Sequence, residues 1–153
     1  MRLSDYLQIE AVDAQVGASN KRGVIRALVG LLLRVAPDLD PNEVVQVLEQ
    51  RETLQSTGIG NGIAIPHGRL EGLSEPIAAL GLSPGGIDFD SLDGGRTHLF
   101  FTVLVPANAQ GLHLEILARL SRLLADKETL ASLLGASEQI DLYTAFVEGD
   151  SKL

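Results

Sequence analysis

The sequence contains no cysteine, which excludes disulfide bonds and metal sites built on thiolates. It also lacks a long apolar segment. The longest apolar run, residues 27–35, is interrupted by Gly30 and Arg34 and is too short to span a bilayer. Residues 1–10 contain no apolar core of the kind that a signal peptide carries. We therefore expect a cytoplasmic protein that does not insert into a membrane.

The composition that is present predicts one globular domain over residues 1–153. A chain of this length with 45% hydrophobic residues can bury a sizeable core. The formal net charge is −8. Such a surface does not suit DNA or RNA, because nucleic-acid affinity comes from neutralising phosphates. It suits a basic protein partner or simple solubility. We find no internal repeat, low-complexity tract or linker.

One glycine-rich stretch, residues 56–68, ends in a histidine and reads S-T-G-I-G-N-G-I-A-I-P-H-G. Glycine stands at every second position of its first half, which gives the backbone unusual freedom. Residues 63–65 are typical of a short buried strand. Pro66 then stiffens the chain, so the pattern predicts that His67 is held at the end of a strand with its ring accessible.

A histidine can serve as a ligand, a general base or a nucleophile, or it can simply bond backbone groups in a turn. The neighbouring glycines favour a functional role for His67, because successive backbone amides can form a concave nest for an anion. A nucleophilic nitrogen beside such a nest suits transient phosphorylation.

Residues 51–68, R-E-T-L-Q-S-T-G-I-G-N-G-I-A-I-P-H-G, resemble the active-site signature of the fructose/mannitol-type enzyme IIA components of the bacterial phosphoenolpyruvate-dependent phosphotransferase system. The resemblance extends over most of the chain and is greatest to the nitrogen-regulatory branch. It implies that His67 is phosphorylated, through its Nε2 atom. It also implies that Arg51 is a cation near the phosphoryl group. A second histidine, His113, matches the H-L-x-x-L segment of the family and would reach the phosphate with its ring N–H.

The sequence departs from the family pattern just before the second histidine. Family members often carry acidic residues there, whereas residues 108–111 read Asn-Ala-Gln-Gly. This difference leaves the local electrostatics and the choice of partner open.

Hydrophobic periodicity predicts strands that alternate with helices. We expect strands at residues 7–12, 63–65, 77–82 and 98–105, and helices at residues 20–36, 41–52, from 113 onward, 127–134 and 137–147. We also expect a turn at residues 83–86. The alternation predicts an α/β fold with a mixed β-sheet sandwiched by α-helices. The strand at 98–105 is apolar on both faces, which predicts a central position in the sheet.

A phosphorylated imidazole gains about two negative charges that donors must meet. The ring proton on the other nitrogen needs a backbone carbonyl, which we place in the turn at residues 68–70. For docking a partner we expect an apolar rim around the histidine. The expected phosphate-stabilising residues are Arg51, Ser56, Thr57, Gly60 and Gly62, beside His113; the expected rim residues are Ile59, Ile63 and Leu70.

No metal or cofactor is required by this chemistry. Asp88, Asp90 and Asp93 alternate like metal ligands, but we interpret them as turn residues because the glutamate that ends a calcium loop is missing. A zinc site from the three histidines lacks a carboxylate at a characteristic spacing. For His98 we expect a structural or solvent-facing role.

Three functions remain open. The chain would be a regulatory phosphocarrier that takes a phosphoryl group from an HPr-like protein and binds other proteins differently in its two states. Alternatively, it would be a sugar-specific IIA subunit that passes the group to a IIB component. The third alternative is a binding module of the same fold that transfers nothing.

Overall fold

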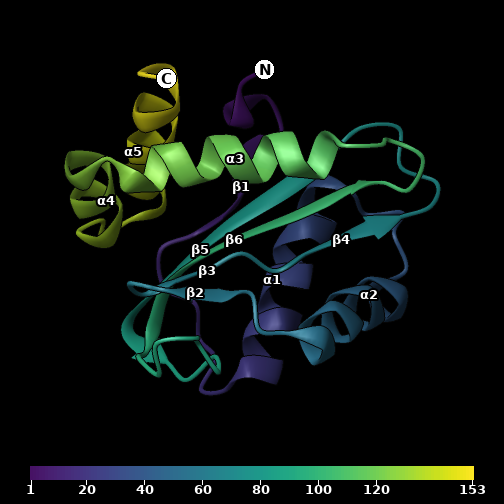
Figure 1. The fold of residues 1–153 in the computed structure, drawn as a ribbon, viewed down its shortest axis with the longest axis horizontal. Coiled ribbons are helices and arrows are strands. Elements are labelled where there is room, and N and C mark those ends of the chain that lie inside the picture. The colour runs from purple at the N-terminus through teal and green to yellow at the C-terminus, as the bar shows by residue number, and fades with distance from the viewer.

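The computed structural model describes residues 1–153, and one mixed sheet lies at its centre between two layers of helices (Figure 1). The strand order is β1-β5-β6-β3-β2, and β4 also pairs with β6. The β1–β5, β3–β6 and β4–β6 pairs are parallel, whereas β2–β3 and β5–β6 are antiparallel. The strands are β1 (Leu7–Asp13), β2 (Gly58–Gly60), β3 (Ile63–Ala64), β4 (His67–Leu70), β5 (Ile77–Ile87) and β6 (Thr97–Pro106). The α/β sandwich predicted from the sequence is confirmed.

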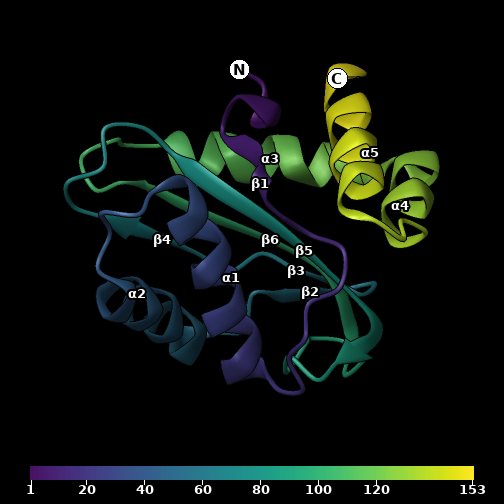
Figure 2. The same ribbon diagram turned by 180° about the vertical axis from the view of Figure 1, so that it is seen from behind.

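Helices cover both faces of the sheet, as the two opposite views show (Figures 1 and 2). The helices α1 (Lys21–Val35) and α2 (Pro41–Leu54) lie on one face. On the other face lie the short 3₁₀ helix η1 (Leu3–Asp5), α3 (Leu112–Ala125), α4 (Lys127–Leu134) and α5 (Gln139–Ser151). None of these helices combines the length and apolar character needed to cross a bilayer.

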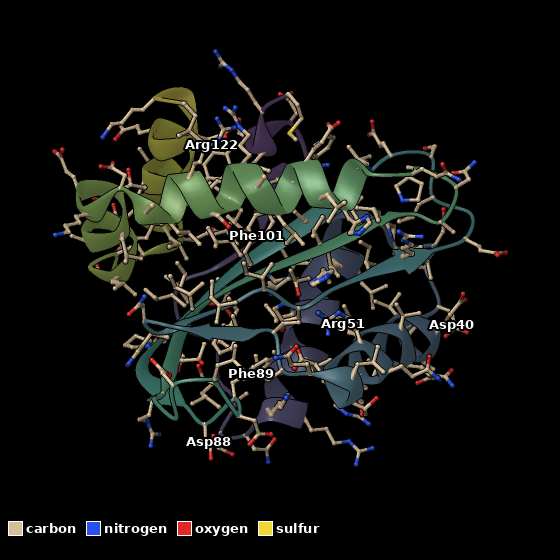
Figure 3. All side chains as sticks on the ribbon, in the orientation of Figure 1. Asp40, Arg51, Asp88, Phe89, Phe101 and Arg122 are labelled. Atoms are coloured by element: carbon tan, nitrogen blue, oxygen red, sulfur yellow. The ribbon has the colours of Figure 1, made fainter.

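Each face of the sheet has its own hydrophobic core, and the aromatic side chains labelled in Figure 3 mark both. Phe101 stacks on Phe146 of α5 with ring centroids 5.3 Å apart. Phe89 packs edge-on against Phe100 at 5.4 Å in the core under α1 and α2. Successive residues of β6 thus enter opposite cores, which confirms β6 as the central, doubly covered strand.

The helix starts follow local capping. Asn20 caps α1 by accepting a hydrogen bond from the Gly23 amide, and Asp40 caps α2 in the same way from Asn42. The last helix begins two residues later than the expected 137: α5 starts at Gln139, and its N-cap residue Glu138 makes no side-chain cap.

The turn predicted at residues 83–86 is wrong, because β5 runs through it with a register shift between Leu82 and Ile87. Such a bulge absorbs the extra residues while keeping the strand paired. The imidazole of His98 stabilises it: its Nδ1 lies 3.0 Å from the Ser83 carbonyl oxygen. The expected structural role of His98 is confirmed.

The strands β3 and β4 follow one another along the same edge of β6. Ile63 is in register with Leu99, and His67 with Val103. Between them, the Pro66 carbonyl accepts hydrogen bonds from the Val103 amide and the buried Thr102 hydroxyl. This break in the edge places His67 halfway along the central strand.

Candidate functional site around His67

His67 is the first residue of β4 and is half-buried. Its Nδ1 lies 2.7 Å from the carbonyl oxygen of Ile65, two residues earlier. A carbonyl can only accept, so the ring proton is on Nδ1 and Nε2 carries a free lone pair. We expected this carbonyl in residues 68–70. Those residues are instead part of β4, and the Leu70 carbonyl accepts from the Ala107 amide.

The environment of His67 favours the neutral ring. Burial lowers the pKa of His67 below its usual value of 6.5, and the positive charge of Arg51 lowers it further. The Ile65 carbonyl and the Glu52 carboxylate act in the opposite direction without reversing the shift. The half-buried imidazole therefore keeps its nucleophilic nitrogen unprotonated at neutral pH.

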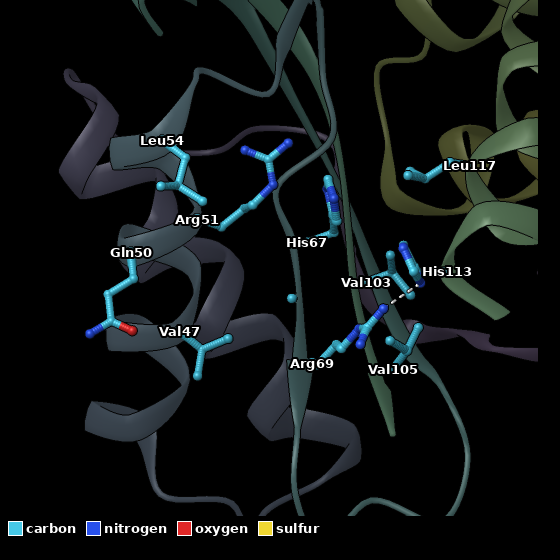
Figure 4. A pocket seen from close by; sticks show the side chains of 11 residues that line it. Val47, Gln50, Arg51, Leu54, His67, Arg69, Val103, Val105, His113 and Leu117 are labelled. Carbon is cyan, nitrogen blue, oxygen red and sulfur yellow. Dashed lines mark hydrogen bonds between the residues drawn. The ribbon is translucent and has the colours of Figure 1, made fainter. Parts of the chain in front are cut away.

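Basic side chains from α2, β4 and α3 line one hollow of about 350 Å³, and the β4 residue His67 is among them (Figure 4). Arg51 comes from the last turn of α2, and His113 from the first turn of α3. The Arg51 Nη1 donates to the Gln55 carbonyl at 3.0 Å, which ties the guanidinium to the end of its helix. The structure thus brings together Arg51, His67 and His113, as the sequence analysis expected.

Arg69 also lines this hollow, and sequence reasoning missed it. Its Nη2 lies 3.4 Å from the Nδ1 of His113 (Figure 4). Residues two apart in a strand share a face, so Arg69 lies on the same face as His67. The sequence could have pointed to Arg69 only if residues 67–70 had been predicted as a strand.

A second hollow of about 310 Å³ adjoins His67 and is lined by Ser56 and Thr57. Both side chains have partners within the protein. The Ser56 hydroxyl donates to the Phe89 carbonyl at 2.9 Å, and the buried Thr57 hydroxyl donates to the Glu52 carboxylate. Neither hydroxyl hydrogen is free for a phosphate, which corrects our expectation for these two residues.

Glu52 itself is buried and paired with Lys21. The two atoms of the ion pair, Oε2 and Nζ, lie 2.9 Å apart. The Thr57 amide donates to both Glu52 oxygens at 3.1 Å. This network fixes the segment that runs from α2 into β2, and with it the wall of the second hollow.

The glycine-rich turn at residues 60–62 does bind a carboxylate, but this carboxylate is the side chain of Asp93 in the same protein. Gly60, Asn61 and Gly62 all have positive φ (94°, 57° and 79°) at the tip of the β2–β3 hairpin. The Asn61 amide donates to Asp93 Oδ2 at 3.1 Å. The Gly62 carbonyl accepts from the His98 amide at the start of β6, whereas His67 faces Val103 farther along. Gly60 and Gly62 line neither hollow beside His67, contrary to our expectation that their amides meet the phosphate.

Residues 5–148 match the model of a family described as "Phosphoenolpyruvate-dependent sugar phosphotransferase system, EIIA 2". The chain belongs to this enzyme IIA family. The match covers most of the chain, so the resemblance noted in residues 51–68 is confirmed. Members of this family are phosphotransfer components.

Individual relatives of this enzyme IIA chain include regulatory and sugar-specific proteins. A "Nitrogen regulatory protein" of Pseudomonas aeruginosa is 39% identical, covering 97% of this chain and 96% of that protein. A "PTS system fructose-specific EIIA component" of Haloferax volcanii is 34% identical, covering 90% and 89%. The crystal structure of nitrogen regulatory protein IIA-Ntr from Neisseria meningitidis has a TM-score of 0.86 at 31% identity, covering 94% and 98%.

Two of the three expected docking residues of this enzyme IIA chain lie inside it. Ile63 and Leu70 are each 4% exposed and belong to the cores on opposite faces of the sheet. Helices cover both faces, so neither residue can contact a partner, and our expectation for them is wrong. Ile59 is 49% exposed. It shares the second hollow with Leu92.

The aspartates after β5 are turn residues of this enzyme IIA fold. Asp88 accepts from the Asp90 amide at 3.1 Å, and Asp93 accepts from the Gly95 amide at 2.9 Å and from the Ser91 hydroxyl at 3.0 Å. The interpretation made from the sequence is confirmed.

Proposed function

We propose that this enzyme IIA chain is a regulatory phosphohistidine carrier. His67 would accept a phosphoryl group from a phosphorylated HPr-like protein in the cytoplasm, and the two states would bind target proteins differently. One observation carries the proposal. His67 donates its Nδ1 proton to Ile65 and presents Nε2 beside a hollow that also contains Arg51 and His113.

The transfer needs little covalent work from the protein. The Nε2 lone pair of His67 forms a bond to phosphorus while the P–N bond to the donor histidine breaks. The electron pair of that bond returns to the donor nitrogen, so no proton has to move. The ring proton stays on Nδ1 throughout and is donated to the Ile65 carbonyl. The new phosphoryl charge is met by the N–H groups of Arg51 that are not used on Gln55, and by the ring N–H of His113.

Partner docking would use exposed apolar side chains around the site. Leu54 lines the hollow of His67 and is 82% exposed, Leu114 follows His113 and is 62% exposed, and Leu92 is 63% exposed beside Ile59. We define Leu54, Ile59, Leu92 and Leu114 as the apolar rim. Large exposed apolar side chains gathered at one place favour protein contact.

The relatives support two kinds of acceptor. The nitrogen regulatory proteins favour regulated target proteins, and we place this role first. The fructose-specific relative of Haloferax volcanii favours a IIB component as acceptor, which makes a sugar-specific IIA subunit the second candidate.

Phosphorylation with labelled phosphoenolpyruvate, enzyme I and an HPr-type protein tests the carrier function. We expect one phosphoryl group per chain, labile to acid and stable to base. His67→Ala should lose it. His98→Gln, a change in the histidine that bonds Ser83, should keep it. Label that survives in His67→Ala would refute the site. A chain that no donor labels would be a non-transferring binding module.

A second experiment separates the two acceptors. The phosphorylated chain is mixed with fructose- and mannitol-type IIB proteins, and loss of label from the chain is followed. A regulatory carrier should keep its phosphate in their presence. Rapid transfer to a IIB protein would favour the sugar-specific role.

A further inference from the structure

Arg69 contacts the second histidine of the site and not the first. Its Nη2 is 3.4 Å from His113 Nδ1, and it comes from β4, two residues after His67. The side chain of Arg69 is exposed, and it has no carboxylate partner within salt-bridge distance. The imidazole nitrogen is thus its only side-chain partner in the structure.

This contact determines where the proton of His113 resides. A guanidinium has only donors, whereas a neutral imidazole has one donor and one acceptor nitrogen. A donor facing Nδ1 therefore requires the lone pair on Nδ1 and the proton on Nε2. The opposite tautomer would place two N–H groups against each other.

The resulting Nε2–H group is what the phosphoryl group needs. Phosphate oxygens only accept hydrogen bonds, so a second histidine is useful there only with a donor nitrogen toward the phosphate. Since His67 and His113 line the same hollow, the Arg69 contact selects the useful tautomer before the phosphate arrives (Figure 4).

We propose that Arg69 is a positioning residue that fixes the Nε2–H tautomer and the ring orientation of His113. This role rests on the proposed phosphocarrier function. Arg69 itself need not touch the phosphoryl group. Outer partners that orient a functional imidazole are a general device in protein sites.

Tautomer and rate can be measured separately. Two-bond ¹H–¹⁵N correlation spectra report which nitrogen of His113 carries the proton, and they require no donor protein. In the wild type we expect the proton on Nε2. Arg69→Met keeps the length of the stem but removes the donors, and should give a mixture of tautomers. Arg69→Lys should restore Nε2–H. Unchanged His113 signals in Arg69→Met would overturn the proposal, whether or not the chain is phosphorylated.

A double-mutant cycle tests the effect on transfer. Arg69→Met should lower the transfer rate constant about 5- to 10-fold, the effect of losing one hydrogen bond, with the KM for the donor unchanged. In a His113→Ala background the same change should have no further effect. A further loss there would mean that Arg69 binds phosphate directly, and a rise in KM alone would make it a docking residue; both would overturn the proposal.

The matched control is Arg122→Met. Arg122 is an exposed arginine on the same helix as His113, and it points away from the sheet (Figure 3). It should leave both the His113 tautomer and the transfer rate unchanged. A comparable loss in Arg122→Met would show that general surface charge sets the rate, which would also overturn the role of Arg69.

Discussion

At the scale of single residues, His67 depends on two opposing local effects. The Ile65 carbonyl lies 2.7 Å from Nδ1 and favours the protonated ring, whereas burial and the positive charge of Arg51 disfavour it. Burial is the largest effect, and the pKa of His67 falls below 6.5. The carbonyl therefore orients the ring and selects its tautomer, while the surroundings keep it neutral.

This lowered pKa makes a prediction about pH. The rate at which His67 accepts phosphate should fall less between pH 7.5 and 6.5 than it would for a histidine with the usual pKa of 6.5, because more of the folded ring stays neutral. The lowered pKa also makes the free energy of unfolding depend on pH. As pH falls below 6.5, the unfolded chain binds a proton before the folded chain does, so the free energy of unfolding decreases until the pH reaches the folded pKa of His67 and stays lowered below it. Above pH 6.5 this decrease is absent.

Titration by NMR measures the pKa of His67 directly, and urea unfolding of wild type and His67→Gln at several pH values measures the linkage. The free energy of unfolding of the wild type should decline relative to the variant below pH 6.5. A His67 midpoint at or above 6.5 would contradict the prediction.

Sequence reasoning could find those residues whose role is visible locally. His67 follows a strand and a proline, so its presentation could be predicted. Arg51 at a helix end and His113 at a helix start were found because the resemblance supported them. Ser56 was wrongly expected to bind phosphate because its partner, the Phe89 carbonyl, lies far away in the sequence. Long-range pairs of this kind leave no local pattern.

At the scale of elements, the close approach of α2 to β4 sets the geometry of the site. A Cβ atom added to Gly68 would lie 2.5 Å from Val47 Cγ1. Real Cβ atoms do not approach this closely, so a side chain at position 68 would force Val47 or its helix to shift. Because Arg51 is one helical turn beyond Val47 and His67 adjoins Gly68, this contact fixes the spacing between the arginine and the histidine.

We predict that Gly68→Ala forces α2 away from β4. Overpacking of this kind costs about 1–3 kcal/mol of unfolding free energy, and the displaced Arg51 should slow phosphorylation. Adding Val47→Ala removes the clashing methyl group and should recover most of both losses. Thermal unfolding and the labelling assay measure the two effects.

The control for this change is Gly17→Ala, where an added Cβ meets no atom within 4 Å. It should leave stability and labelling nearly unchanged. If the Val47→Ala double variant were no better than Gly68→Ala alone, the close approach would not be the cause.

Element types were more predictable than the contacts between elements. The boundaries of α4 agree with the prediction, and those of α1 and β6 lie within one or two residues, because caps and periodicity are local. The bulge in β5 was predicted as a turn, because a Pro-Gly-Gly sequence is compatible with either structure. The Gly60–Gly62 nest was recognised, but its anion, Asp93, comes from a segment that only the fold brings near.

At the scale of the whole molecule, the two cores on opposite faces of the sheet determine which apolar side chains remain exposed for docking a partner. A helix layer on each face removes Ile63 and Leu70 from the surface. Leu54 of α2, Ile59 of β2 and Leu92 of the loop after Phe89 line the two hollows beside His67, and Leu114 follows His113 in α3. Their gathering is a product of the fold and has no signature in the local sequence.

The apolar rim leads to a prediction about affinity. Leu54→Ser and Leu92→Ser should each raise the KM for the phosphorylated donor roughly fivefold, as expected for an interface side chain that contributes about 1 kcal/mol. Since both are exposed, the free energy of unfolding should change by less than about 0.5 kcal/mol, and the rate at saturating donor should hold. Ile140→Ser is the control, because Ile140 is equally apolar and 51% exposed but lies on α5. A KM that rises as much in Ile140→Ser, or in neither rim variant, would show that partners dock elsewhere.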